Sequence, residues 1–256
     1  MVKVSALERG LELPIGGYAL SAGQLHVISK AEEKLADACM RKYGLRYRAK
    51  SSDSAAKYIP GTNRRYGVLN PAVVSEYGYH LPETRSAPRG PELSDKEILA
   101  LNGGMGATAE VNGSTVPEGG CLGQVKQDLR GKYTDEKGVR TAQNIASAGF
   151  EQSMNSQSVE KATKEWSQCM KGKGFSYRTP LQALGADENS GQQITKREIS
   201  AAKADVDCKT RTDLVKIWSD QESEIQKDMI KKNRDDLHRL SEAHRKLLAE
   251  ARSITG

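Results

Sequence analysis

The sequence has few aromatic residues, few prolines and no long apolar run. Aromatic residues make up 5% of the 256 residues, and there are 8 prolines. No stretch approaches the roughly 18 consecutive apolar residues of a membrane-spanning helix, so no transmembrane segment is expected. Hydrophobic residues amount to 37%, below the usual share of about 45–50% but still enough for a core. These properties exclude a collagen, a membrane-spanning protein and a fully disordered chain.

Motifs for catalysis and cofactor binding are also missing. None of the four histidines, His26, His80, His238 and His244, has zinc-ligand spacing to a cysteine or to another histidine. The chain contains no G-x-S-x-G nucleophile elbow, and its glycines near residues 103–120 do not follow the phosphate-binding order G-x-x-x-x-G-K-[ST]. The sequence therefore predicts no metal, no cofactor and no catalytic residue. An enzyme of unrecognised class is the weakest of three hypotheses, and His80 would then be the first residue to test.

The positive net charge is spread along the chain. The formal charge is +6, and residues 194–256 hold 14 basic and 12 acidic residues. Mixed charge of this kind is typical of a solvated helical surface, whereas a protein that follows a phosphate backbone needs a basic stripe. No specific nucleic-acid partner is expected.

A ten-residue unit containing a cysteine occurs twice, 130 positions apart. Cys39 begins CMRKYGLRYR and Cys169 begins CMKGKGFSYR, which share the pattern C-M-x3-G-[LF]-x-Y-R. A helical stretch precedes each cysteine, and the glycine that both copies contain, Gly44 or Gly174, is suited to a left-handed helix end. We expect each cysteine to lie about five residues before the end of a helix and to be structural.

Two disulfides are expected from this repeat. Each copy has one later cysteine available, so we predict Cys39–Cys121 and Cys169–Cys208; four cysteines allow three pairings, and the crossed ones stay open. Disulfides persist in oxidising compartments. The first twenty residues lack the features of a signal peptide, but a chain that starts after a removed leader would look the same. We therefore expect an extracellular protein or one at the outer face of the membrane, with a cytoplasmic location as the alternative.

The predicted fold is mainly α, a helical bundle with irregular loop segments and one small hairpin. Ser21-x-x-Gln24, Ser94-x-x-Glu97 and Thr195-x-x-Glu198 are capping boxes, and Asn112-Gly113 between β-branched residues predicts a two-stranded ribbon. From Gly191 to Gly256 there are 64 intervening residues without glycine or proline. One helix over 196–253 would be nearly 90 Å long, so we expect it to protrude, bend or break near 231–236 or near 220–222. Self-association through this helix is the alternative function, that of an assembly protein.

The chain is expected to form one disulfide-stapled domain of two loosely repeated halves, about 13–133 and 139–256. Residues 81–93 contain three prolines and predict an exposed linker. Six of the thirteen aromatic residues lie between Tyr43 and Tyr79, where the pattern is irregular. We predict that this segment presents a ligand-binding surface, made of Tyr47, Tyr58, Arg64, Arg65, Tyr66, Tyr77, Tyr79 and His80.

Four short motifs resemble a group of uncharacterised exported proteins and lipoproteins from actinomycetes such as Streptomyces. They are Cys-Met-x3-Gly, Arg65-Tyr66-Gly67-Val68, residues 77–82 (YGYHLP) and residues 116–121 (VPEGGC). The resemblance implies a mature domain at the outer face of the membrane, and it carries no activity. Together these observations predict a non-enzymatic protein of the cell envelope that binds a ligand, an envelope component or another protein.

Overall fold

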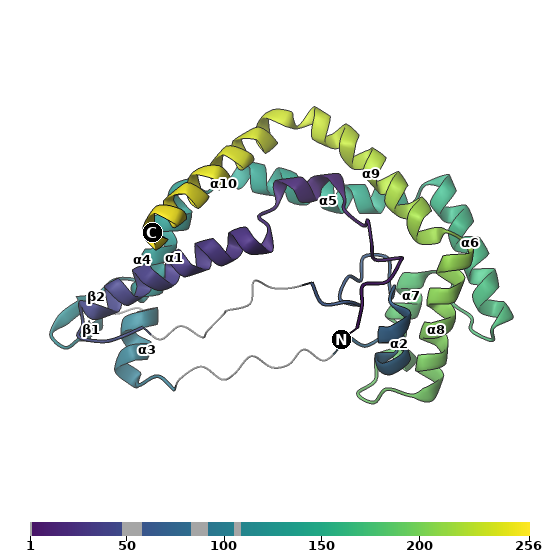
Figure 1. Ribbon diagram of the computed structural model, residues 1–256, viewed down its shortest axis with the longest axis horizontal. Helices are drawn as coiled ribbons and strands as arrows, with labels where there is room; N and C mark the ends of the chain where they lie inside the picture. Colours follow the sequence, from purple (N-terminus) through teal and green to yellow (C-terminus); the bar gives the residue numbers. More distant parts are fainter. Residues whose placement is uncertain (1, 48–57, 83–91, 105–108) are drawn as a thin grey trace. The chain divides into compact units, whose positions relative to one another are not determined.

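The computed structural model describes residues 2–47, 58–82, 92–104 and 109–256, which are mainly helical (Figure 1). The α-helices in chain order are α1 Ala22–Arg41, α2 Pro71–Tyr77, α3 Asp95–Asn102, α4 Gly120–Val125, α5 Glu136–Met154, α6 Gln157–Gly172, α7 Pro180–Leu184, α8 Lys196–Arg211, α9 Leu214–Lys232 and α10 Arg234–Thr255. The strands are β1 Ala109–Val111 and β2 Ser114–Val116. The predicted fold class is confirmed. Most of the predicted linker 81–93 lies outside the described residues.

The chain divides into two compact units, and each is built from three segments. Unit 1 comprises Met1–Gly17, Tyr58–Arg85 and Ala142–Asn233, and unit 2 comprises Tyr18–Lys57, Ser86–Thr141 and Arg234–Gly256. These units do not follow the two sequential halves expected from the repeat. The reason is that the last helix, α10, packs against α1 near the start of the chain.

Both copies of the Cys-Met unit end a helix in the same way. In unit 2 the Leu45 N–H donates to the Met40 carbonyl and the Gly44 N–H donates to the Arg41 carbonyl. The Phe175 and Gly174 N–H groups make the equivalent bonds to Met170 and Lys171 in unit 1. This pair of bonds is the Schellman motif. It requires a left-handed residue, and φ is 70° at Gly44 and 87° at Gly174.

Each unit contains one of the two predicted disulfides. Cys39 of α1 is bonded to Cys121 of α4, and Cys169 of α6 is bonded to Cys208 of α8. The Cα atoms are 5.7 Å apart in both. The predicted pairing is confirmed, and each bond joins a repeated helix end to a neighbouring helix of its own unit.

In unit 2, helix α1 packs against α10 and α4. Its first turn is fixed by the predicted capping box of Ser21 and Gln24. The hairpin β1–β2 turns at Asn112 and Gly113, whose φ angles are 50° and 77°, as an Asn-Gly turn requires. The buried core here is apolar, with one cluster around Cys39–Cys121 and another between α1 and α10 that contains Ile28, Ala31, Leu129, Leu247, Leu248 and Ala251.

In unit 1, helices α6, α8 and α9 pack together, and α2 packs on α8. Trp166 and Trp218 are buried at the centre, where their indole N–H groups donate to Asp205 Oδ1 and Ser153 Oγ. Buried indole groups normally find such partners. Both tryptophans therefore belong to the core of unit 1.

The stretch after Gly191 forms three helices instead of one. The break between α9 and α10 falls at Asn233, inside the predicted window 231–236. The break between α8 and α9 falls at Thr212 and Asp213, where Asp213 adopts a left-handed φ of 49°. Asp tolerates this conformation better than most residues, but neither residue is a strong breaker in sequence. The alternative break near 220–222 was wrong, since α9 continues through it.

No helix in the described ranges is both long and apolar enough to cross a membrane.

Candidate functional site

Seven of the eight predicted ligand-binding residues lie in unit 1, and Tyr47 lies in unit 2. In unit 1 they occupy the described segment 58–82, which precedes, forms and follows the short helix α2. Three buried carboxylates hold this segment, and they come from the N-terminal region, α8 and α9. The contacts of these three groups decide whether the segment can act as a binding surface.

Glu222 of α9 holds Arg65 and Tyr66. The Arg65 guanidinium donates through Nε and an Nη to the Glu222 carboxylate, and the Tyr66 hydroxyl donates to Oε2 at 2.9 Å. Gln226 completes the set with a bond of 2.8 Å to Oε1. Burial and the charge of Glu222 raise the pKa of Tyr66. Burial works against the charged form of Arg65, but its bonds to Glu222 outweigh burial and raise its pKa.

Glu8 of the N-terminal region holds the start of the segment. It accepts bonds from the Tyr58 hydroxyl, the Gly61 N–H and the Asn70 amide at 2.7, 2.6 and 2.6 Å. Burial opposes the charged carboxylate, but the bonds from Ser5, Gly61, Tyr58 and Asn70 together lower its pKa. Burial and the bond to Glu8 raise the pKa of Tyr58 to about 12.

Glu198 of α8 holds the end of the segment. Its Oε1 accepts the Tyr79 N–H at 2.8 Å and lies 3.6 Å from His80 Nε2. Its other oxygen closes the capping box with Thr195. Arg64 donates to the His80 carbonyl at 2.7 Å, and burial lowers the pKa of Arg64.

Two of the tyrosines predicted to form the ligand-binding surface are buried by these contacts. Tyr66 and Tyr79 are only 1% and 4% exposed, so their ring faces are not available to a partner. Tyr77 is half-buried at the end of α2, and Tyr58 is exposed. Tyr47 belongs to the other unit, where its N–H donates to Asp37. The sequence could not reveal these contacts. The carboxylate partners of Tyr58 and Tyr66 lie 50 and 156 positions away, and no local pattern connects residues that far apart.

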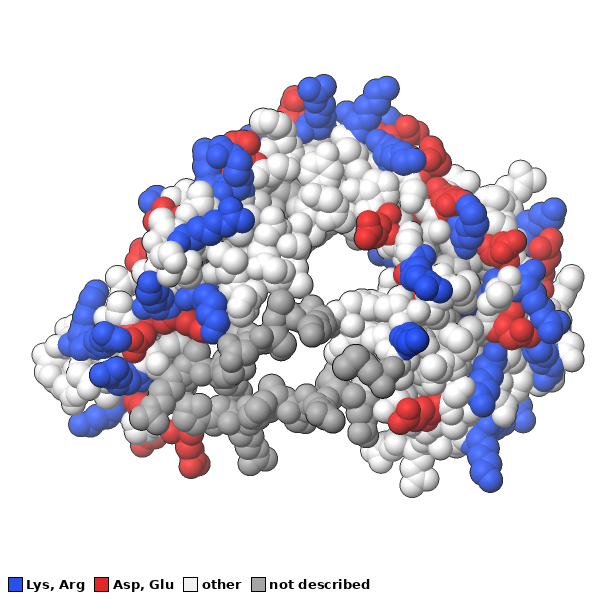
Figure 2. All heavy atoms as spheres, in the orientation of Figure 1, with Lys and Arg blue, Asp and Glu red and all other residues white. Residues whose placement is uncertain are grey.

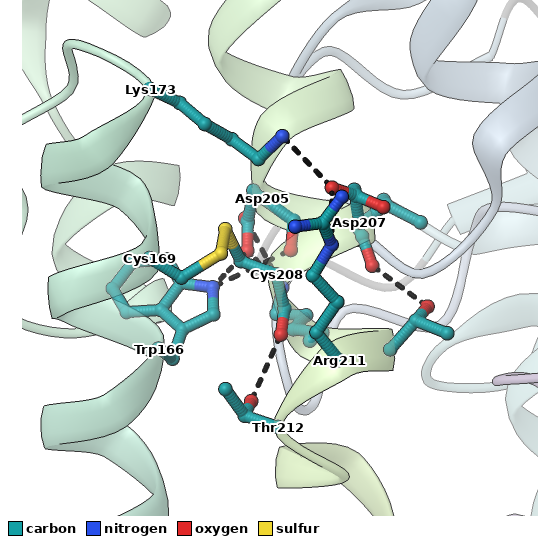
Figure 3. The surroundings of a disulfide bond; sticks show 11 residues. Trp166, Cys169, Lys173, Asp205, Asp207, Cys208, Arg211 and Thr212 are labelled. Atoms are coloured by element: carbon teal, nitrogen blue, oxygen red, sulfur yellow. Dashed lines mark hydrogen bonds and ion pairs between the residues drawn. A yellow bond between two sulfur atoms is a disulfide. The ribbon is translucent and has the colours of Figure 1, made fainter.

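Asp205 lies beside the disulfide of unit 1 (Figure 3), and it forms a buried ion pair with Lys209. Lys209 Nζ is 3.0 Å from Asp205 Oδ1 and also donates to the Val68 carbonyl. Both side chains are fully buried, and burial raises the pKa of Asp205 and lowers that of Lys209, whereas their mutual attraction opposes both shifts. Through its bond to the Val68 carbonyl, the pair fixes α8 against the segment around Val68.

Unit 1 also contains a large groove that the sequence did not predict. Its volume is about 680 Å³, within the range of about 300–1,000 Å³ that ligand sites occupy. One face of α6 forms a wall, with Met154 and Asn155 at the end of α5, Arg178 and Thr179 after the helix stop, and Trp218 of α9 completing it. The α6 residues are Glu160, Thr163, Lys164, Ser167, Gln168 and Lys171.

Three cations line this groove without a carboxylate partner. Lys164, Lys171 and Arg178 are exposed, and within the described part of the chain none of them forms an ion pair. Glu160 is the one acidic residue of the lining, so the groove carries a formal charge of 3 − 1 = +2. Thr163, Ser167 and Gln168 add hydrogen-bonding groups beside the cations. A sequence signal existed, because Lys164 and Lys171 are seven residues apart and share a helix face.

Elsewhere the visible surface mixes both signs of charge, with basic and acidic side chains interspersed (Figure 2). The described residues contain no group of three or more His, Cys, Asp or Glu that could hold a metal ion. Comparison of the chain with protein-family models, curated proteins and solved structures finds no match. Among the described residues, the groove of unit 1 is therefore the candidate site that the geometry supports best.

Proposed function

We propose that this protein is a non-enzymatic binding protein of the cell exterior, and that it binds its ligand in the groove of unit 1. The observation that carries the proposal is a groove of about 680 Å³ whose three cations have no partner among the described residues. Charged groups on a protein surface usually gain little from pairing, but three like charges gathered around one concave site create a positive potential that favours a bound anion.

The location outside the cytoplasm rests on different observations. Both disulfides are formed, all four cysteines are used in them, and such bonds persist in oxidising compartments. The resemblance of the four short motifs to exported actinomycete proteins agrees with this location. Alkylation of free thiols in protein taken directly from its native cells, followed by mass measurement, tests it. Four alkylated cysteines would contradict an exported protein and favour a cytoplasmic one.

The binding function is tested by calorimetric titration with three amphiphiles that share an octyl chain. They are octyl phosphate, octyltrimethylammonium and octyl glucoside, which are anionic, cationic and neutral. We expect at least one to bind the wild-type protein and to lose binding in Thr163→Trp, whose indole ring would fill the groove. If none binds, or if Thr163→Trp binds equally well, the groove is not the binding site.

Light scattering of the same samples tests the assembly alternative. A monomer at high concentration agrees with a binding protein, since the long C-terminal segment is divided into α8, α9 and α10. A stable dimer lost on substitution of exposed α10 residues would instead favour an assembly protein.

A further inference from the structure

We infer that the groove of unit 1 binds an anionic amphiphile, a molecule with a phosphate or carboxylate head and an apolar body. The inference rests on the proposed function and deepens it by naming the ligand class. Its main support is an internal comparison, because the repeated helix end sets the two preceding helices in one register, and the corresponding positions of unit 2 also line a cavity.

The equivalent cavity lies on the same face of the repeated helix. It has a volume of about 460 Å³ and is lined by Lys30, Glu33, Lys34, Asp37, Tyr47 and Thr255. At the offset of 130 that relates the two cysteines, the first four correspond to Glu160, Thr163, Lys164 and Ser167. All four of these line the groove of unit 1. The two cavities are therefore two versions of one structural site.

The cations in the unit 2 cavity are already bound by the protein. Lys30 pairs with Glu33 at 3.0 Å, and Lys34 Nζ donates to the carbonyls of Ile254 and Thr255 at 2.8 and 3.3 Å. Arg41, next to this cavity, pairs with Asp37 at 2.5 Å. The lining itself holds two cations and two carboxylates, a formal charge of 2 − 2 = 0.

In unit 1 the two carboxylates are replaced by two hydroxyl groups. Thr163 stands where unit 2 has Glu33, and Ser167 stands where it has Asp37. Both side chains bond the backbone of the tyrosine after the helix end, but Ser167 donates to the Tyr177 carbonyl, whereas Asp37 accepts the Tyr47 N–H. The helix end is thus preserved while these two carboxylates are lost, and Glu160, in the position of Lys30, is the one acidic residue left in the lining. Lys164 and Lys171 are left free to bind an external anion.

The apolar part of the ligand is indicated by the remaining lining. Met154 is half-buried at the end of α5, and the nearly buried Trp218 contributes to the groove. The methylene stems of the lysines add apolar surface below their charged ends. A phosphate or carboxylate head would lie among the charged ends, and its apolar body would lie against Met154 and the lysine stems.

The test is titration of octyl phosphate into the full chain and into two variants of equal charge. Thr163→Glu with Ser167→Asp gives unit 1 the carboxylates of unit 2 and changes the charge by −2. Lys203→Glu changes the charge by the same amount at an exposed position of α8 that does not line the groove. We expect the double variant to bind at least about tenfold more weakly, because the added carboxylates pair with the cations, and the control to bind within about twofold of wild type.

A second variant keeps the test valid if the double variant unfolds. Lys164→Gln with Lys171→Gln removes two exposed cations that have no ion-pair partner among the described residues, so the fold should be unaffected. We again expect about tenfold weaker binding, and a loss of affinity for the wild type as salt screens the cations. Binding that is unchanged in this variant would overturn the inference.

The other probes separate the parts of the proposal. Binding of octyl glucoside or octyltrimethylammonium in preference to octyl phosphate would overturn the anionic ligand while the proposed binding function survives. Inorganic phosphate that binds as tightly as octyl phosphate would overturn the apolar part. Sedimentation with phosphatidylglycerol vesicles then distinguishes the source: co-sedimentation indicates a membrane lipid and its absence indicates a free amphiphile, and both belong to the inferred class.

Discussion

The two units contain the same helix end and disulfide arrangement but differ in where their charged side chains lie. All nine buried polar or charged residues of the described chain, among them Glu8, Glu198 and Glu222, lie in unit 1. Unit 2 has an apolar core, and its ion pairs, such as Arg41–Asp37, are at the surface. The same helix end and disulfide therefore support two different arrangements. In unit 1 buried carboxylates hold an irregular segment, and in unit 2 the charged side chains at the surface pair with one another. The cations of the groove, which have no ion-pair partner among the described residues, occur in unit 1.

Loss of the disulfides gives the largest expected effect in this comparison. In the chain-entropy model each bond stabilises its unit by about 4 kcal/mol, and the longer loop gains about 0.6 kcal/mol more. The sequence separations are 82 for Cys39–Cys121 and 39 for Cys169–Cys208. Double alanine variants of each pair should therefore lose comparable stability in urea unfolding. If either double variant lost less than about 1 kcal/mol of unfolding free energy, the two disulfides would not stabilise their units equally.

Breaking the buried ion pair of unit 1 is the next effect. Lys209→Ala leaves the fully buried Asp205 without its cation, and the expected loss is at least about 3 kcal/mol. Fluorescence follows this unfolding specifically, because Trp166 and Trp218 both lie in unit 1. Arg41→Ala is the control for an exposed pair and should cost less than about 1 kcal/mol. Equal effects of the two substitutions would remove the contrast between the units.

The two helix ends can be compared through their glycines. Gly44→Ala and Gly174→Ala each place a side chain at a left-handed φ, but neither new Cβ would meet an atom closer than 3.9 Å. Each should therefore cost only the conformational penalty of about 1 kcal/mol, and the two values should agree. Thermal unfolding measures both. A cost confined to one glycine would show that the two copies of the repeat are not energetically equivalent.

The smallest expected effect is the pH-dependent contribution of Asp37 to the stability of the fold. Bonds from the Tyr47 N–H and Arg41 lower the pKa of Asp37 from its usual 3.8. A lowered folded-state pKa stabilises the fold above the unfolded value, and that contribution disappears as the pH falls through the folded-state pKa. Asp37→Ser, which introduces the residue of unit 1, should therefore destabilise the protein slightly at pH 7 and less at pH 2. Urea unfolding at both pH values checks this, and a larger effect in acid would reverse the sign.

Much of the fold could be predicted because its signals are local. The capping boxes at Ser21, Ser94 and Thr195, the Asn112-Gly113 turn and the repeated glycine each act within a few residues. The break at Asp213 escaped prediction because a left-handed Asp has no distinct pattern. The assignment of α10 to unit 2 also escaped, since it depends on packing between opposite ends of the chain.

The sequence did not predict the groove, and it left the environment of the tyrosines open, for a related reason. Tyrosine and arginine between residues 43 and 80 are equally consistent with an exposed surface and with a segment bound by distant carboxylates. Only the positions of Glu8, Glu198 and Glu222 decide between the two. A comparison of the two helices at the same offset, before the ten repeated positions, shows that Thr163 and Ser167 stand where unit 2 has Glu33 and Asp37.

The most direct test of the central claim is the number of octyl phosphate molecules that bind per chain. Both units have the repeated cavity, but only unit 1 leaves its cations free, so calorimetry should give one site for the wild type and none for Thr163→Glu with Ser167→Asp. Two sites per chain, or one site that survives this double substitution, would show that the exchange of carboxylates for hydroxyls does not create the binding site.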